Sequence, residues 1–270
     1  MPTMDSQRRI AAMCGMSGLA SGMRHILILG GTVEARQLAG RLAQRTDLGV
    51  TLSLAGRTAQ PAAQPVPVRS GGFGGVGGLA DYLTAQHIDA LIDATHPYAA
   101  IISRHAAEAA ARTGTPILAL RRPSWTPVAG DRWIDVDDVT GAVHALGDTS
   151  RRVFLTIGRN EVAAFAVASQ HSYLVRSVDP IEPPLAVPNA TYIVARGPFS
   201  EADEYTLLKT HRTEFVVSKN SGSDATYGKI AAARSLGITV VMLRRPALPT
   251  VPSVESVEDA VRWLDHAPEP

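Results

Sequence analysis

The sequence has only one cysteine, Cys14, among its 270 residues. A lone cysteine cannot close a disulfide within the chain, and it cannot build a metal site of the kind that several cysteines share. This excludes a disulfide-stabilised extracellular scaffold, and we expect a cytoplasmic protein. None of the other histidines shares a metal-ligand spacing with His96, so we also expect no bound metal.

Aromatic residues and net charge are also scarce, at 5% of the chain and a formal value of +1. A near-neutral chain lacks the general attraction that basic proteins have for nucleic acid, and few aromatic rings are left to stack on bases. No apolar run approaches the length of a membrane-spanning helix, which is about 20 residues. We therefore expect no nucleic-acid or membrane partner, and any anionic ligand must be met by local arginines.

What the sequence does contain is a regular alternation of short apolar runs and helical patterns from Met23 onward. Such alternation is typical of parallel sheets with right-handed crossovers. The length suits two domains, and the polar residues 147–150 mark a boundary. We therefore predict an α/β protein with a disordered extension at residues 1–23, a first domain at 24–148 and a second at 149–270. The predicted strands lie near residues 24–29, 50–54, 66–69, 90–94, 117–120, 133–136, 153–158, 173–176, 192–198, 215–218 and 238–243.

A weak internal echo links the two halves. Residues 111–123 and 233–246 share an Ala-Arg pair, a glycine, an apolar run and a closing Arg-Arg-Pro. Such echoes arise from duplication or by chance in proteins of this class. The sequence leaves both explanations open.

The first strand, at residues 24–29, ends in Gly30 and Gly31 and passes into a helix that begins at Thr32 or Val33. Glycine lets the backbone approach a ligand closely, and a helix N-terminus favours phosphate or carboxylate. The turn lacks the full glycine spacing of the dinucleotide fingerprint. An ordinary tight turn is therefore the alternative interpretation.

Arginine recurs at the ends of the predicted strands, which is where ligands of such sheets bind. Its planar guanidinium suits carboxylate and phosphate groups. Arg57 follows the second strand, where folds that bind NAD place an acid, so we expect NADP to be preferred. One such arginine is also consistent with a solvated loop charge, and only the repeated placement on one edge favours an anion site. The strand-end arginines are Arg57, Arg69, Arg121, Arg122, Arg159, Arg176, Arg196, Arg244 and Arg245.

A set of short motifs follows in order along the chain. They are Gly-Gly-Thr-x-Glu (30–34), Ala-Gly-Arg (55–57), Arg-x-Gly-Gly-Phe-Gly-Gly (69–75), Asp-Ala-Thr-His-Pro-Tyr-Ala (93–99), Arg-Pro-x-Trp (122–125), Ala-Arg-Gly-Pro-Phe (195–199), Lys-Asn-Ser-Gly (219–222) and Arg-Pro (245–246). Through them the chain resembles the precorrin-6A reductase family, over residues 24–264. The resemblance implies an NADPH-dependent enzyme of cobalamin (vitamin B12) biosynthesis, which reduces one double bond of the precorrin-6A macrocycle to give precorrin-6B. It also implies two Rossmann-like domains with a cleft between them.

The resemblance also assigns roles to single residues. It implies that His96 and Lys219 are catalytic, while the proton added beside the hydride could come from His96, Lys219 or solvent. Whether cobalt is already in the ring stays open. The cofactor-binding residues that it implies are Gly30, Gly31, Thr32, Glu34, Ser53, Arg57, Gly71, Gly72, Phe73, Gly74 and Thr95. The substrate-binding residues are Arg176, Arg196, Gly197, Lys219, Asn220 and Ser221.

Two other functions stay open from the residues alone. One is an NADP-dependent oxidoreductase of another anionic substrate, and the other is a non-enzymatic NADP-binding sensor. A sensor does not require the charged strand ends of a second domain, such as Arg196 and Lys219. We expect an enzyme that acts as a monomer on a polycarboxylate macrocycle and hands its product to neighbouring pathway enzymes.

Deleting residues 1–22 is expected to leave folding and activity unchanged, because this segment has no helical or strand periodicity. Thermal unfolding and turnover of the shortened chain check this. A melting temperature several degrees below that of the full chain would show that the segment packs on the body.

Overall fold

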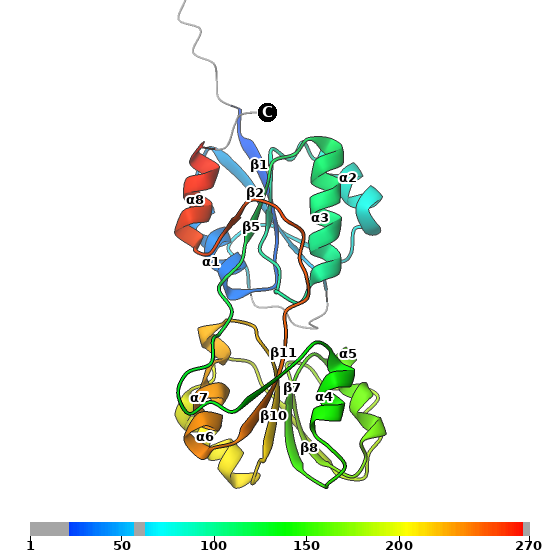
Figure 1. The fold of residues 1–270 in the computed structure, drawn as a ribbon. Coiled ribbons are helices and arrows are strands. Elements are labelled where there is room, and N and C mark those ends of the chain that lie inside the picture. The colour runs from blue at the N-terminus through cyan, green and yellow to red at the C-terminus, as the bar shows by residue number, and fades with distance from the viewer. Residues whose placement is uncertain (1–21, 57–62, 267–270) are drawn as a thin grey trace, which may run out of the picture.

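The structure is a computed structural model that describes residues 22–56 and 63–266. Arg57 and all but the last two positions of the predicted extension lie outside the described residues. Two α/β domains lie one above the other in Figure 1, and each is built on a six-stranded sheet. Within the described residues, no helix combines the length and the apolar character that crossing a membrane requires.

Domain 1 is built on a sheet with the strand order β12-β5-β4-β1-β2-β3. All neighbouring strands pair in parallel. This is the order of a dinucleotide-binding fold, in which the direction of chain progression reverses between β1 and β4. The elements are β1 (Arg24–Leu29), α1 (Val33–Leu42), β2 (Leu48–Leu54), β3 (Val68–Ser70), α2 (Gly75–Ala85), β4 (Ala90–Asp93), α3 (Ala100–Thr113), β5 (Ile117–Leu120), β12 (Ser253–Val254) and α8 (Val257–His266).

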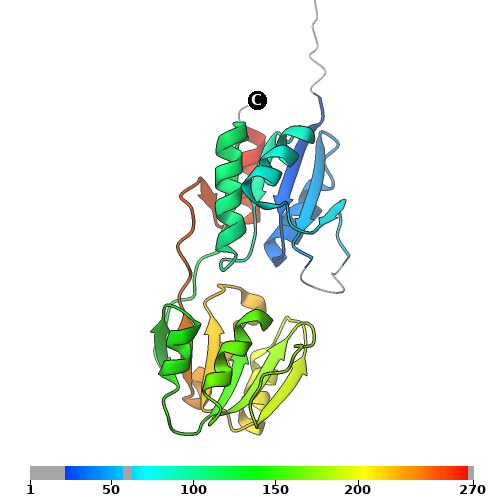
Figure 2. The ribbon, with the colours of Figure 1, turned by 90° about the vertical axis from the view of Figure 1, so that its right-hand side faces the viewer.

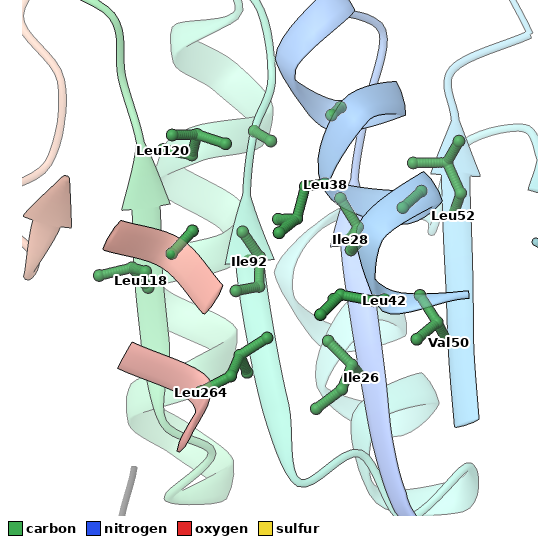
Figure 3. Packing of buried hydrophobic residues seen from close by; sticks show 14 of the residues in the cluster. Ile26, Ile28, Leu38, Leu42, Val50, Leu52, Ile92, Leu118, Leu120 and Leu264 are labelled. Carbon is green, nitrogen blue, oxygen red and sulfur yellow. The ribbon is translucent and has the colours of Figure 1, made fainter. Parts of the chain in front are cut away.

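Helices cover both faces of this sheet, with α1 and α8 on one side and α2 and α3 on the other (Figure 1). Side chains alternate along β1, so Ile26 and Ile28 enter one core cluster whereas Leu27 and Leu29 enter the other. A strand that is buried on both faces shows as a continuous apolar run, which is why the sequence predicted it well. Figure 3 shows the first cluster, to which α8 contributes Leu264.

Domain 2 repeats this order, as β6-β11-β10-β7-β8-β9, with all pairs parallel. Therefore β7 corresponds to β1, and β10 corresponds to β4. The elements are β6 (Trp133–Val136), α4 (Val139–Ala145), β7 (Arg152–Thr156), α5 (Arg159–Val162), the 3-10 helix η1 (Ala163–Val167), β8 (Ser172–Ser177), β9 (Ala190–Val194), α6 (Glu201–Thr210), β10 (Phe215–Lys219), the 3-10 helix η2 (Asp224–Thr226), α7 (Gly228–Leu236) and β11 (Thr239–Leu243). The predicted α/β fold with two Rossmann-like domains is confirmed.

The edge strand next to β5 comes from the second half of the sequence, and the edge strand next to β11 comes from the first half. β6 follows β5 along the chain, yet it pairs with β11 in domain 2. β12 follows β11, yet it pairs with β5 in domain 1. The boundary predicted at residue 148 is therefore corrected. Domain 1 consists of residues 24–120 and 253–266, and domain 2 consists of residues 133–243.

Two linkers, residues 121–132 and 244–252, consequently run between the domains (Figure 1). The internal echo of the sequence occupies the same structural position in both halves, from the end of a helix through a strand into a linker. Gly114 and Gly237 end α3 and α7 with φ values of 72° and 65°, a left-handed conformation that favours glycine. This equivalence supports duplication over chance.

Leu264→Ala is expected to lower the free energy of unfolding by about 2–5 kcal/mol. The reason is that Leu264 is 1% exposed within the core of domain 1. Chemical denaturation measures the loss, and Arg262→Ala, on the exposed side of the same helix, is the control, with an expected change below about 0.5 kcal/mol. An equally small change for Leu264→Ala would contradict the packing of α8 on domain 1.

Candidate functional site

The carboxyl ends of the two sheets meet at the junction between the domains. Tyr98, in the loop after β4, donates a hydrogen bond from its hydroxyl to the carbonyl of Leu243 at the end of β11. The same hydroxyl accepts a hydrogen bond from the N–H of Asn220, after β10, at 2.7 Å. Glu34 of α1 forms an ion pair with Arg122 of the first linker. Ligands of open parallel sheets bind beyond the carboxyl ends of the strands, so this junction is the candidate site.

The turn between β1 and α1 has the geometry of an anion-binding site. The hydroxyl of Thr32 donates to the carbonyl of Ala94 at 2.8 Å and accepts from the N–H of Ala35 at 3.1 Å, which caps α1. Gly31 has φ +116°, and a Cβ there would meet nothing within 4 Å. The backbone of the turn is thus open to a ligand, and the positive end of the α1 dipole lies beside it. The cofactor role predicted for Gly31 is consistent with this geometry, whereas a Cβ at Gly30 would lie 2.6 Å from the buried side chain of Leu52 and the hydroxyl of Thr32 is bonded within the protein.

The ends of β2 and β3 bring together a second group of predicted residues. The guanidinium of Arg69 donates to the carbonyls of Gly71 and Gly72, both at 2.6 Å, and to the hydroxyl of Ser53 at 3.4 Å. It also lies 3.7 Å from the ring centroid of Phe73. These contacts hold the glycine-rich loop in one shape. They place a guanidinium beside Ser53, where dinucleotide folds hold the adenine ribose.

The loop after β4 is ordered by Asp93, which is 3% exposed. Its carboxylate accepts from the N–H of Thr95 at 3.2 Å and from the hydroxyl of Thr95 at 2.7 Å. The hydroxyl of Thr95, predicted to bind the cofactor, is therefore held within its own loop. Its contribution is to fix the backbone that leads to His96.

His96 is a neutral imidazole at the junction. Burial lowers its pKa to about 3, and the cations Arg122, Lys219 and Arg245 add to this effect. Nδ1 accepts the N–H of Tyr98 at 3.3 Å, which assigns the ring proton to Nε2. A neutral imidazole has no acidic proton to give to a substrate carbon, so its geometry and charge suit a hydrogen-bond donor.

Lys219 ends β10 and lies between groups from both domains. Its Nζ is 2.6 Å from Oε2 of Glu161 in α5 and 5.0 Å from the ring centroid of Tyr98. The side chain is 18% exposed. The structure thus brings Lys219 and His96, the two residues predicted to be catalytic, into the same junction.

Asn220 and Ser221 hold the linkers in place. The side chain of Asn220 accepts from the N–H of Trp125 and donates to the carbonyl of Trp125, both at 2.8 Å. Arg245 donates to the carbonyl of Asn220 at 2.9 Å, and Arg122 donates to the carbonyl of Ser221 at 2.6 Å. The substrate role predicted for Asn220 is therefore not supported, because its amide is committed to the first linker.

Arg176 lies inside domain 2 and is 8% exposed. Its guanidinium forms a two-point contact with Glu204 and stacks 3.7 Å from the ring centroid of Phe199. A buried cation needs its counter-ion, so this pairing stabilises α6 against β8, and the predicted substrate role of Arg176 is corrected. Arg196 and Gly197 lie in the loop after β9, where Arg196 is exposed.

Lys229, in the first turn of α7, is a buried charge that was not predicted from the sequence. It is 4% exposed, donates to the carbonyl of Thr226 at 2.7 Å and lies 5.2 Å from the ring centroid of Trp125. Burial lowers its pKa to about 7. Its charge also contributes to the low pKa of His96. No sequence signal marks Lys229, because its segment shows only the pattern of an ordinary helix.

Comparison with known proteins gives a consistent result. The family model of precorrin-6x reductase CbiJ/CobK matches residues 25–265. The chain is 56% identical to a precorrin-6A reductase of Sinorhizobium sp over 241 residues, which are 89% of this chain and 92% of that protein. A solved structure of the CobK precorrin-6A reductase has a TM-score of 0.86 and 46% identity, covering 92% of this chain and 99% of that one. A cobalt-precorrin-6A reductase of Priestia megaterium is 26% identical, over 88% of this chain and 97% of that protein.

His96→Gln is expected to reduce the loss of stability in acid. His96 is protonated in the unfolded chain below its ordinary pKa of 6.5, but in the folded chain only near pH 3. The free energy of unfolding of the wild type therefore falls as the pH drops from about 6.5 toward 3, by up to about 1.4 kcal/mol per pH unit from this residue. Chemical denaturation across this range measures the slope. An equal slope in the variant would contradict a neutral His96.

Proposed function

The chain belongs to the precorrin-6x reductase family, and we propose that it reduces one double bond of precorrin-6A with NADPH, giving precorrin-6B in cobalamin biosynthesis. The observation that carries this proposal is the position of Tyr98. This residue of domain 1 contacts Lys219 and Asn220 of domain 2. The strand ends suited to a dinucleotide and the strand end that carries the lysine therefore form one site.

The cofactor fits domain 1. The open backbone at Gly31, the capped start of α1 and the guanidinium beside Ser53 match the pyrophosphate and ribose of a dinucleotide. A bound nicotinamide supplies the hydride. The chain must hold the ring and the macrocycle close together and keep water away from them.

NADPH rather than NADH is the cofactor that the charges favour. The side chain beside Ser53 is Arg69, and Arg57 follows the same strand in the sequence. A 2′-phosphate carries about two negative charges, and guanidinium groups bind it through charge-assisted hydrogen bonds. No acid stands at the end of β2 to hold the free ribose hydroxyls.

The junction also suits a polycarboxylate macrocycle. Four cations lower the pKa of His96, and they are Arg122, Lys219, Arg245 and Lys229. Among them, Arg122 and Lys219 have carboxylate partners within the described residues, in Glu34 and Glu161. Lys229, with a pKa of about 7, is only partly charged near neutral pH, so the excess positive charge comes mainly from Arg245 and favours an anionic ligand. Neutral His96, with its proton on Nε2, donates a hydrogen bond to that ligand.

Lys219 is the group that gives the proton to the carbon beside the one that receives the hydride. Of the three sources open from the sequence, His96 is neutral and has no proton of suitable acidity. Lys219 has an ammonium group held at the junction. Its N–H bond breaks as the new C–H bond forms, and the resulting amine regains its proton from solvent.

The substrate is the metal-free macrocycle. The relative named precorrin-6A reductase is 56% identical to this chain, whereas the relative named cobalt-precorrin-6A reductase is 26% identical. We also propose that the protein is a cytoplasmic monomer that passes its product to the next enzyme of the pathway. A sensor, the non-enzymatic alternative, would not need the Lys219–Glu161 pair at the junction.

The direct test of this function is NADPH oxidation by the purified protein, followed by absorbance with and without precorrin-6A. Oxidation is expected only when the macrocycle is present. Unchanged NADPH absorbance in the complete mixture would count against the reductase, and oxidation with a smaller anionic acceptor alone would favour the other oxidoreductase.

Arg57→Ala is expected to reduce a preference for NADPH over NADH that is about tenfold or more in the wild type, because one charge-assisted contact is lost. Titration of both cofactors into both proteins measures it. Arg41→Ala, on the exposed part of α1, is the control and should retain the preference. Equal affinities in the wild type, or an unchanged preference after Arg57→Ala, would contradict the assignment.

Lys219→Ala is expected to lower kcat/KM for the macrocycle at least about tenfold, which corresponds to roughly 1.4 kcal/mol of transition-state binding. Binding of NADPH alone should change little, because the cofactor is assigned to domain 1. Steady-state kinetics and NADPH titration separate the two effects, with Lys209→Ala on α6 as the control. Wild-type turnover would make Lys219 a structural charge, and a loss of NADPH affinity instead would place the cofactor in domain 2.

A further inference from the structure

The two domains share a strand order, so each position at one carboxyl edge has a counterpart at the other. β7 holds in domain 2 the place that β1 holds in domain 1. The turn from β7 to α5, at Gly158, is thus the counterpart of the turn at Gly31. In a dinucleotide fold this turn is where a phosphate binds.

In domain 2 this turn already binds an anionic group, the carboxylate of Glu161 from the same chain. Oε2 of Glu161 accepts the N–H of Gly158 at 2.9 Å and is 2.6 Å from Nζ of Lys219. One carboxylate oxygen therefore joins the turn after β7 to the lysine at the end of β10. At the counterpart turn, a Cβ on Gly31 would meet no atom of the described residues within 4 Å, so that position is open.

We propose that Glu161 is a positioning residue for Lys219, holding its ammonium at the junction for proton transfer to the macrocycle. This inference rests on the function proposed above for Lys219. A lysine side chain has four rotatable bonds and loses up to about 2 kcal/mol of conformational entropy when it is fixed. The anchored carboxylate fixes it before the substrate arrives. The same carboxylate repels a phosphate from the turn at Gly158, which leaves the dinucleotide to domain 1.

The surroundings distinguish this pair from an ordinary surface ion pair. The side chains of Lys219 and Glu161 are 18% and 31% exposed, whereas those of Arg41 and Glu258 are 65% and 59% exposed. Exposed pairs contribute little because water screens them and both side chains stay mobile. The ring of Tyr98 covers the ammonium from the side of domain 1. The pair is thus less exposed than a surface ion pair, and its lysine lies beside a ring of the other domain.

The test is a double-mutant cycle with Glu161→Gln and Lys219→Ala, using the full chain, NADPH and precorrin-6A. Glutamine keeps the shape and an oxygen that can accept the N–H of Gly158, so only the negative charge that pairs with Lys219 is lost. Glu161→Gln is expected to lower kcat about tenfold, with KM for the macrocycle and affinity for NADPH within about twofold of the wild type. The solvent deuterium isotope effect on kcat is expected to rise, because proton transfer becomes more rate-limiting. Glu258→Gln is the control that loses an exposed ion pair.

The outcomes separate this proposal from the assignment of Lys219. With Lys219→Ala already in place, Glu161→Gln is expected to cause no further loss. An equal loss in both backgrounds, or a lower melting temperature with an unchanged isotope effect, would overturn the positioning role and make Glu161 a structural residue. Wild-type turnover of Lys219→Ala would instead show that the function proposed for Lys219 is wrong. If Glu161→Gln does not fold, Glu161→Asp, which keeps the charge on a shorter side chain, replaces it in the cycle and is expected to retain more turnover than Glu161→Ala.

Discussion

The two sheets exchange edge strands, and this exchange determines how the domains and their ligand edges meet. Because β6 joins domain 2 and β12 joins domain 1, the chain must run between the domains twice. Both linkers leave from a carboxyl edge, after β5 and after β11. Arg245 fastens the linkers to each other, since it donates to the carbonyls of Arg122 and Pro123, both at 2.9 Å. The two carboxyl edges are thereby held close to one another, and ligand sites that would be separate in two free domains become one.

This arrangement also explains the electrostatics of the site. Burial and cations from a strand end, the two linkers and the start of α7 together keep the imidazole of His96 neutral. Clustered cations in a partly buried site cost stability unless an anion is bound. A polycarboxylate substrate supplies that anion. The site is therefore most stable when the substrate is bound. This suits a macrocycle that must be shielded from water while it is reduced.

The sequence predicted the parts of this structure that depend on local pattern. β1, β4 and β10 are short apolar runs with buried residues on both faces, and the glycines and charges that follow them mark the ligand edge. Partners distant in sequence could not be predicted. Arg176 is paired with Glu204, 28 residues away, so its burial was missed, and either sheet could have accepted β6 or β12. The contacts of Glu161 and Asn220 could not be predicted for the same reason. Glu161 pairs with Lys219 and Asn220 bonds Trp125, and only the fold brings these residues together.

A structure of the chain with NADP⁺ and the macrocycle bound together would test the central claim most directly, because the two domains offer equivalent turns for one dinucleotide. We expect the pyrophosphate at Gly31 and Thr32, the 2′-phosphate near Ser53 and Arg69, and the macrocycle beside Lys219 at the junction. A dinucleotide seated at the turn of Gly158, with the Glu161 carboxylate displaced from Lys219, would contradict it.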